Sequence, residues 1–173
     1  MQPRDIAPQE ILLPVKPAFI AFTLVVALTA NLLPLSGPWL AVKPDFIALI
    51  VLYWCIQQPR KFGFAGAWLL GLAMDVADGS LFGQHALAYS VLAFAGIVLH
   101  RRVLMFGMQN QVLHVISILL LNNLIVLAVR MLAGADFPGF IYFAGSFIAG
   151  ALWPVMCPLL KLPQRPAPGR DNA

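Results

Sequence analysis

Two aspartates and a histidine lie close together in the sequence and are the residues best suited to do chemistry. Asp75 and Asp78 form a D-x-x-D pair, and His85 follows shortly after them. Two carboxylates and an imidazole nitrogen can bind a divalent cation, and a bound cation can assist hydrolysis or group transfer. Their spacing matches no strong metal motif, however, and a bare D-x-x-D is weak evidence for cation-assisted chemistry. We therefore expect neither a metal site nor a catalytic site here.

The polar run that contains these residues reads as a turn between two apolar segments. Its members are Asp78, Gly79, Ser80, Leu81, Phe82, Gly83, Gln84 and His85. An Asp-Gly pair is typical of a turn with a positive φ angle, so Gly79 is expected to end the preceding helix. Ser80 is expected to cap the helix that follows. His85 is placed to bond either Asp75 or Asp78.

Asp75 also continues a stripe of small residues. Gly63, Ala67 and Gly71 recur every four positions, and residues at this spacing share one helix face, where small side chains allow close packing of a second helix. Asp75 is the next step and should point the same way. Three interpretations stay open for it: a solvated carboxylate at the membrane interface, a hydrogen bond to a neighbouring helix, or direct binding of a ligand or ion.

Three further polar residues interrupt or border apolar segments. Asn122 and Asn123 lie at the centre of a long apolar stretch, and adjacent helix positions diverge by about 100°. They are expected either to bond a neighbouring helix, to line a pocket, or to contact a second membrane protein. Asp45 follows Lys43 and Pro44 and is expected to cap the next helix.

The segments that hold these residues are apolar enough to cross a membrane. The 173-residue chain is 61% hydrophobic and only 10% charged, far from the composition of a soluble domain. The sequence predicts an all-α bundle of six transmembrane helices, at 17–35, 45–58, 62–78, 83–100, 111–133 and 139–160. Residues 1–16 are expected to form a cytoplasmic leader, residues 17–160 the membrane domain, and residues 161–173 a disordered cytoplasmic tail.

The basic residues predict the orientation of this bundle. With six spans, nine of the eleven Lys and Arg residues fall on one side: Arg4, Lys16, Arg60, Lys61, Arg101, Arg102, Lys161, Arg165 and Arg170. Cytoplasmic loops retain positive charge, so both termini are expected to be cytoplasmic. Only Lys43 and Arg130 are expected outside. The distribution explains the net charge without any nucleic-acid partner.

Helix length predicts the arrangement of the spans. The second and third spans are short for a bilayer, so both are expected to be surrounded by other helices. The fifth span has no glycine and is expected to face lipid or a partner protein. No P-loop, zinc-protease, Cys-x-x-Cys, dinucleotide-binding or nucleophile-elbow motif is present in the sequence, so we expect no enzyme and no cofactor.

Two stretches together resemble the rod-shape-determining MreD family. They are Pro44-Asp45-Phe46 with Tyr53-Trp54 and Gln58-Pro59, then Gly71 to Asp75 with the run from Asp78 to Tyr89. The resemblance implies a scaffold in the bacterial inner membrane, part of the machinery that elongates the cell. It implies MreC as a direct partner, and MreB, RodA and a class-B penicillin-binding protein as further partners. Membrane lipid is expected around the helices.

The resemblance also implies a likeness to the substrate-binding subunits of energy-coupling-factor vitamin transporters. An alternative function is therefore a small-molecule-binding or transport subunit, with a membrane pocket near Asp75 and His85. A third hypothesis is a membrane enzyme that acts on a lipid-linked substrate through Asp75 and Asp78. A ligand that stabilises the protein would favour the second hypothesis over the scaffold.

Overall fold

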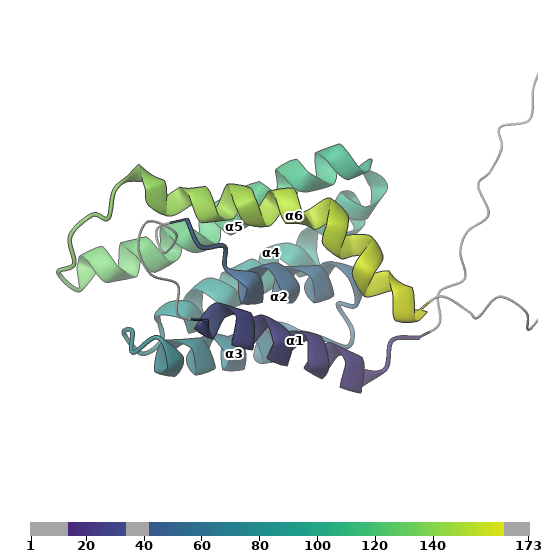
Figure 1. The fold of residues 1–173 in the computed structure, drawn as a ribbon, viewed down its shortest axis with the longest axis horizontal. Coiled ribbons are helices and arrows are strands. Elements are labelled where there is room, and N and C mark those ends of the chain that lie inside the picture. The colour runs from purple at the N-terminus through teal and green to yellow at the C-terminus, as the bar shows by residue number, and fades with distance from the viewer. Residues whose placement is uncertain (1–13, 34–41, 165–173) are drawn as a thin grey trace, which may run out of the picture.

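The computed structural model of the protein describes residues 14–33 and 42–164, which fold into an all-helical bundle (Figure 1). Its α-helices are α1 (Pro17–Leu32), α2 (Phe46–Gln57), α3 (Phe64–Ala77), α4 (Gln84–Met105), α5 (Met108–Leu132) and α6 (Ala144–Lys161). Two short 3₁₀ helices, η2 (Phe140–Phe143) and η3 (Leu162–Gln164), flank α6. The described residues contain no β-strand. This is the helical membrane bundle that the sequence predicts.

The helices differ in their capacity to cross a bilayer alone. Three segments are long and apolar enough by length and composition: Gln84–Met105, Met108–Leu132 and Phe140–Gln164. Helices α1, α2 and α3 are also apolar but have only 16, 12 and 14 residues. At about 1.5 Å per residue, the shortest of them covers about 18 Å, well below the thickness of the hydrocarbon layer. A short helix can persist in a membrane when other helices cover it.

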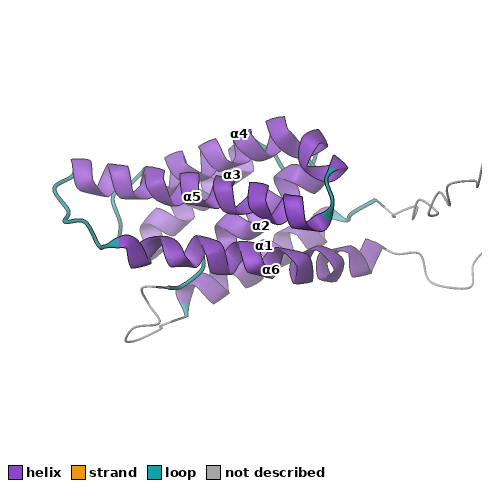
Figure 2. Cartoon of the chain, turned by 90° about the horizontal axis from the view of Figure 1, so that it is seen from above, coloured by secondary structure: helices purple, strands orange, loops and turns teal. Residues whose placement is uncertain are grey.

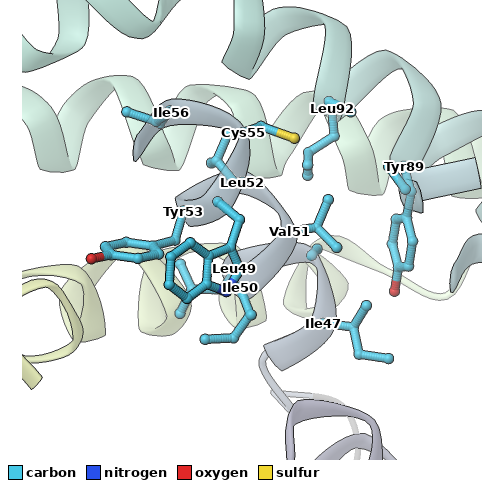
Figure 3. Packing of buried hydrophobic residues seen from close by; sticks show 14 of the residues in the cluster. Ile47, Leu49, Ile50, Val51, Leu52, Tyr53, Cys55, Ile56, Tyr89 and Leu92 are labelled. Carbon is cyan, nitrogen blue, oxygen red and sulfur yellow. The ribbon is translucent and has the colours of Figure 1, made fainter. Parts of the chain in front are cut away.

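Helix α2 meets this condition because it lies at the centre of the bundle. It packs against α1, α4, α5 and α6. Every residue from Ile47 to Ile56 is buried, so the whole helix is apolar contact surface (Figure 3). Tyr53 stacks edge-on against both Trp54 and Trp153, with ring centroids 5.0 and 5.8 Å apart. The prediction that a short second span is surrounded by other helices is confirmed.

The same prediction is wrong for α3, which lies at the edge of the bundle. Its main contact is with α4 alone. Phe64, Trp68, Leu69 and Val76 are exposed on its outer side. One face, carrying Ala67, Gly71, Met74 and Asp75, is buried. A short length therefore does not by itself place a helix in the centre.

Several boundaries also differ from prediction. Helix α4 runs on to Met105, so Arg101 and Arg102 lie within its last turns, and the connection to α5 is reduced to Phe106 and Gly107. The chain stays helical through Gln164, whose buried amide donates to the Leu160 carbonyl, so a disordered tail does not begin at residue 161. Residues 1–13 of the expected leader and residues 165–173 of the expected tail lie outside the described residues.

The helices lie side by side along the long axis of the molecule (Figures 1 and 2). The start of α1 and the end of α6 are at one end of the bundle, on the right in Figure 1. The ammonium of Lys61, in the α2–α3 connection, donates to the carbonyl of Val15 there, at 2.7 Å. The α3–α4 and α5–α6 connections lie at the opposite end, which we call the outer end. Most polar candidates from the sequence gather at the outer end.

Candidate functional site

Asp75 is buried at the outer end, where its carboxylate receives hydrogen bonds from the start of α4. The backbone N–H groups of Gly83 and His85 donate to it at 2.7 Å each, and that of Ala86 lies at 3.4 Å. The Nδ1 of His85 is 2.9 Å from the same carboxylate, and the Ser80 hydroxyl donates at 3.1 Å. A negative charge is favourable beside the unpaired N–H groups of a helix N-terminus. Asp75 thus caps a helix other than its own.

The turn between α3 and α4 brings these donors into place. The N–H of Ser80 bonds the Asp75 carbonyl and that of Gly79 bonds the Val76 carbonyl, which is the pattern of a Schellman C-cap. Gly79 and Gly83 have φ angles of +59° and +97°, a region that favours glycine. Gly83 is the residue before α4 and has no capping side chain of its own. Ser80 donates to Asp75, so its expected role as the cap of α4 is wrong.

Close packing of α3 on α4 makes this geometry possible. A Cβ atom built at Gly71 would lie 2.4 Å from the Cα of Ala86, so only glycine fits this contact. Ala67 on the same stripe is fully buried. Gly63 does not belong to the contact: it is the N-cap of α3, and a Cβ there would meet nothing within 4 Å. The packing surface therefore begins one turn later than the sequence pattern indicates.

Asp45 anchors a second hydrogen-bond network beside the first. Its carboxylate caps α2 through the N–H of Ala48 at 2.9 Å. It also accepts from the Tyr89 hydroxyl at 2.9 Å and from the Asn31 amide at 2.9 Å. Asn31 in turn accepts from the N–H of Phe46 and from the Lys43 ammonium. These bonds tie the end of α1 and the start of α2 to α4.

The two networks line one cavity of about 630 Å³ at the outer end. Its walls come from the ends of α1, α3 and α5, the starts of α2 and α4, and η2. Polar lining residues include Lys43, Asp78, Ser80, Gln84, Asn123 and Arg130, together with Asn31, Asp45, His85 and Tyr142. A volume of this size lies in the range of small-molecule sites. We call it the outer cavity.

The two asparagines of α5 point to different surroundings. The Asn123 amide donates to the Ser146 hydroxyl of α6 at 2.8 Å and the residue lines the outer cavity. Asn122 is buried, and its side-chain oxygen has no hydrogen-bond partner among the described residues. Adjacent positions on a helix diverge, and here only one of the two side chains joins α5 to α6.

The chemistry available to Asp75 and His85 is limited by these contacts. Because a carboxylate only accepts hydrogen bonds, Nδ1 of His85 carries the proton, and only Nε2 is left for another group. Within residues 14–33 and 42–164, no three His, Cys, Asp or Glu side chains gather in a way that would hold a metal ion. Asp78 is exposed and lies outside the Asp75 network.

Comparisons with known proteins identify the family. The family described as rod shape-determining protein MreD matches residues 15–162, which is almost all of the helical bundle. The chain belongs to the MreD family. It is also 29% identical to the rod shape-determining protein MreD of Haemophilus influenzae over 141 residues, covering 79% of this chain and 85% of that relative. No solved structure matches the chain. Membership in the MreD family assigns the chain a role in rod shape determination.

Several residues of the outer site of this MreD-family chain were not predicted from the sequence to belong to it. Asn31, Lys43 and Tyr89 complete the Asp45 network, and Ser146 receives the bond from Asn123. Asn31 carries a usable signal, since it is an amide within an apolar helix and such groups seek partners. Ser146 and Tyr89 give little signal in the sequence, because their hydrogen-bond partners come from distant segments.

Proposed function

We propose that this chain is a non-enzymatic, multi-pass scaffold of the bacterial inner membrane that binds MreC and helps organise peptidoglycan synthesis during cell elongation. The observation that carries the proposal is the match to the MreD family over residues 15–162. Contacts with MreB, RodA and a class-B penicillin-binding protein follow in the same assembly, directly or through MreC.

The geometry supports a scaffold over an enzyme. The residues best suited to chemistry, Asp75 and His85, bond each other and the start of α4, so they serve the fold. The chain offers apolar helix faces on which a transmembrane partner can pack. Helix α5 is the clearest of these, since Leu113, Leu121 and Leu124 are exposed along it. Exposed Arg101 and Arg102 offer a basic contact at the other end of the bundle.

A co-purification experiment with matched variants tests the proposal. A tagged copy replaces the chromosomal one, and complexes are purified in mild detergent and identified by mass spectrometry. We expect MreC in stoichiometric amounts. Leu124→Trp, on the exposed face of α5, should reduce MreC recovery and round the cells, whereas Val98→Trp, on an exposed position of α4, should not. A normally inserted chain that supports rod shape without retaining any MreC would contradict the proposal.

A further inference from the structure

The outer cavity holds both basic residues that the charge pattern places outside. Lys43 precedes α2 and Arg130 lies in the last turn of α5, far apart in sequence, yet both line this cavity. Positive charge is concentrated on the cytoplasmic side of membrane proteins, so two cations that converge outside need a reason. Among the described residues, Arg130 forms no side-chain hydrogen bond, and Lys43 bonds only a backbone carbonyl. Both retain donors for an anion.

The opposite charge comes from the α3–α4 turn. Asp78 lines the cavity, and its carboxylate accepts no hydrogen bond from the described residues. His85 also lines the cavity, and its Nε2 is open because Nδ1 bonds Asp75. Asp75 does not line the cavity, and Asp45 keeps its negative charge, but its carboxylate oxygens already accept several internal hydrogen bonds and are not open to a ligand. The cavity therefore offers two open cations, one open carboxylate and neutral acceptors.

We propose that the outer cavity binds a small zwitterion, a group that carries a phosphate and a primary ammonium. Arg130 and Lys43 recognise the phosphate, since guanidinium and ammonium groups are the usual phosphate partners in proteins. Asp78 and the Nε2 of His85 accept from the ammonium. A simple anion would leave Asp78 beside it with like charge, and a simple cation would lie beside Lys43 and Arg130. A zwitterion offers its phosphate to the two basic residues and its ammonium to Asp78 and His85.

Such a group has two sources, the headgroup of a phosphatidylethanolamine lipid or a soluble phosphoethanolamine compound. The full chain, purified in an uncharged maltoside detergent, is mixed with equal amounts of phosphatidylethanolamine and phosphatidylglycerol and examined by native mass spectrometry. In parallel, thermal unfolding is followed with glycerophosphoethanolamine, glycerol 3-phosphate or ethanolamine. A ligand that binds only the folded state raises the unfolding temperature with its concentration. We expect glycerophosphoethanolamine to raise the unfolding temperature at concentrations where neither glycerol 3-phosphate nor ethanolamine does.

Variants at exposed positions tie the binding to the cavity. Arg130→Gln and Asp78→Asn should each weaken binding about ten-fold or more, the effect of losing one charged hydrogen bond. Arg101→Gln, an exposed residue at the other end of the bundle, should leave it unchanged. If the chain retains phosphatidylethanolamine but glycerophosphoethanolamine does not raise its unfolding temperature, the lipid headgroup is the source. If the chain retains the lipid and glycerophosphoethanolamine also raises the unfolding temperature, a soluble compound is the source. Equal stabilisation by glycerol 3-phosphate, no binding of either zwitterion, or binding unaffected by both variants would overturn the proposal.

Discussion

The carboxylate of Asp75 in the last turn of α3 lies 2.9 Å from Nδ1 of His85 in the first turn of α4, and the backbone N–H of His85 donates to it as well. The carboxylate would be opposed by the dipole of its own helix, because it stands at the C-terminal end of α3. It is stabilised instead by the N-terminal end of α4. One side chain therefore fixes the angle and register at which two helices meet.

Asp75→Asn should destabilise the chain. The amide retains one acceptor oxygen but places its NH₂ group against N–H donors, so we expect a loss of about 1–3 kcal/mol in the free energy of unfolding. Thermal unfolding in detergent, followed by tryptophan fluorescence, measures this loss. Asp136→Asn is the matched control because that carboxylate is exposed in the α5–α6 connection and does not line the outer cavity. Equal stability of the two variants would mean that the Asp75 contacts contribute nothing to folding.

Gly71→Ala should be far more damaging than Gly63→Ala. A methyl group at Gly71 would lie 2.4 Å from the Cα of Ala86, a backbone atom that cannot move aside, whereas one at Gly63 meets nothing within 4 Å. Overpacking at such a contact typically costs about 1–3 kcal/mol. The yield of monodisperse protein and its unfolding temperature should fall for Gly71→Ala only. If both variants behave like the parent chain, α3 and α4 do not pack through Gly71.

Tyr89→Phe should weaken the second network. The phenol donates to both oxygens of Asp45, at 3.0 and 2.9 Å, and its loss leaves a partly buried carboxylate with one donor fewer. We expect a loss of about 1.5–3 kcal/mol, as is typical of a hydrogen bond to a charged group. Tyr142→Phe is the control, because the Tyr142 hydroxyl forms no hydrogen bond with the described residues. An unchanged unfolding temperature for Tyr89→Phe would show that Asp45 is satisfied without it.

The orientation predicted from charge can be tested by cysteine labelling. Phe82 is 75% exposed in the outer turn, and Arg101 is exposed near the end of α4. A membrane-impermeant maleimide applied to spheroplasts should label Phe82→Cys and should reach Arg101→Cys only after lysis. The parent chain is the background control, since Cys55 and Cys157 are buried. Labelling in the reverse order would invert the topology.

Sequence patterns predicted the elements of this fold better than their contacts. Apolar runs located the six α-helices of residues 14–33 and 42–164, because a span must be apolar over most of its length whatever it packs against. The charged pair Arg101 and Arg102 was taken as the end of the fourth helix, but α4 continues to Met105. Long basic side chains near a helix end can reach water while the helix continues. Helix length correctly placed α2 in the centre but not α3.

The candidate site was also predicted only in part, because some of its contacts are local in sequence and others join distant segments. Asp75, Gly79, Gly83 and His85 lie within eleven residues of one another, and their turn chemistry is legible from local sequence. The Asp45 network joins Asn31 and Tyr89 across three helices, and local sequence carries no information on which distant segments meet. Ser80 was misassigned because a serine before a helix usually caps it, and here a carboxylate from the preceding helix occupies that position.

Asn122→Leu and Asn123→Leu should have opposite effects although the residues are adjacent. The side-chain oxygen of Asn122 is buried without a hydrogen-bond partner in the described structure, so replacing the amide with an apolar side chain of similar size removes a desolvation penalty. Stability should stay the same or rise. Asn123→Leu removes the bond to Ser146 and should lower stability by about 0.6–2 kcal/mol, the usual range between membrane helices. Unfolding temperatures of the two purified variants measure the difference. If Asn122→Leu instead unfolds more easily, or abolishes rod shape while remaining stable, then the Asn122 oxygen has a partner outside the described residues, such as a second membrane protein.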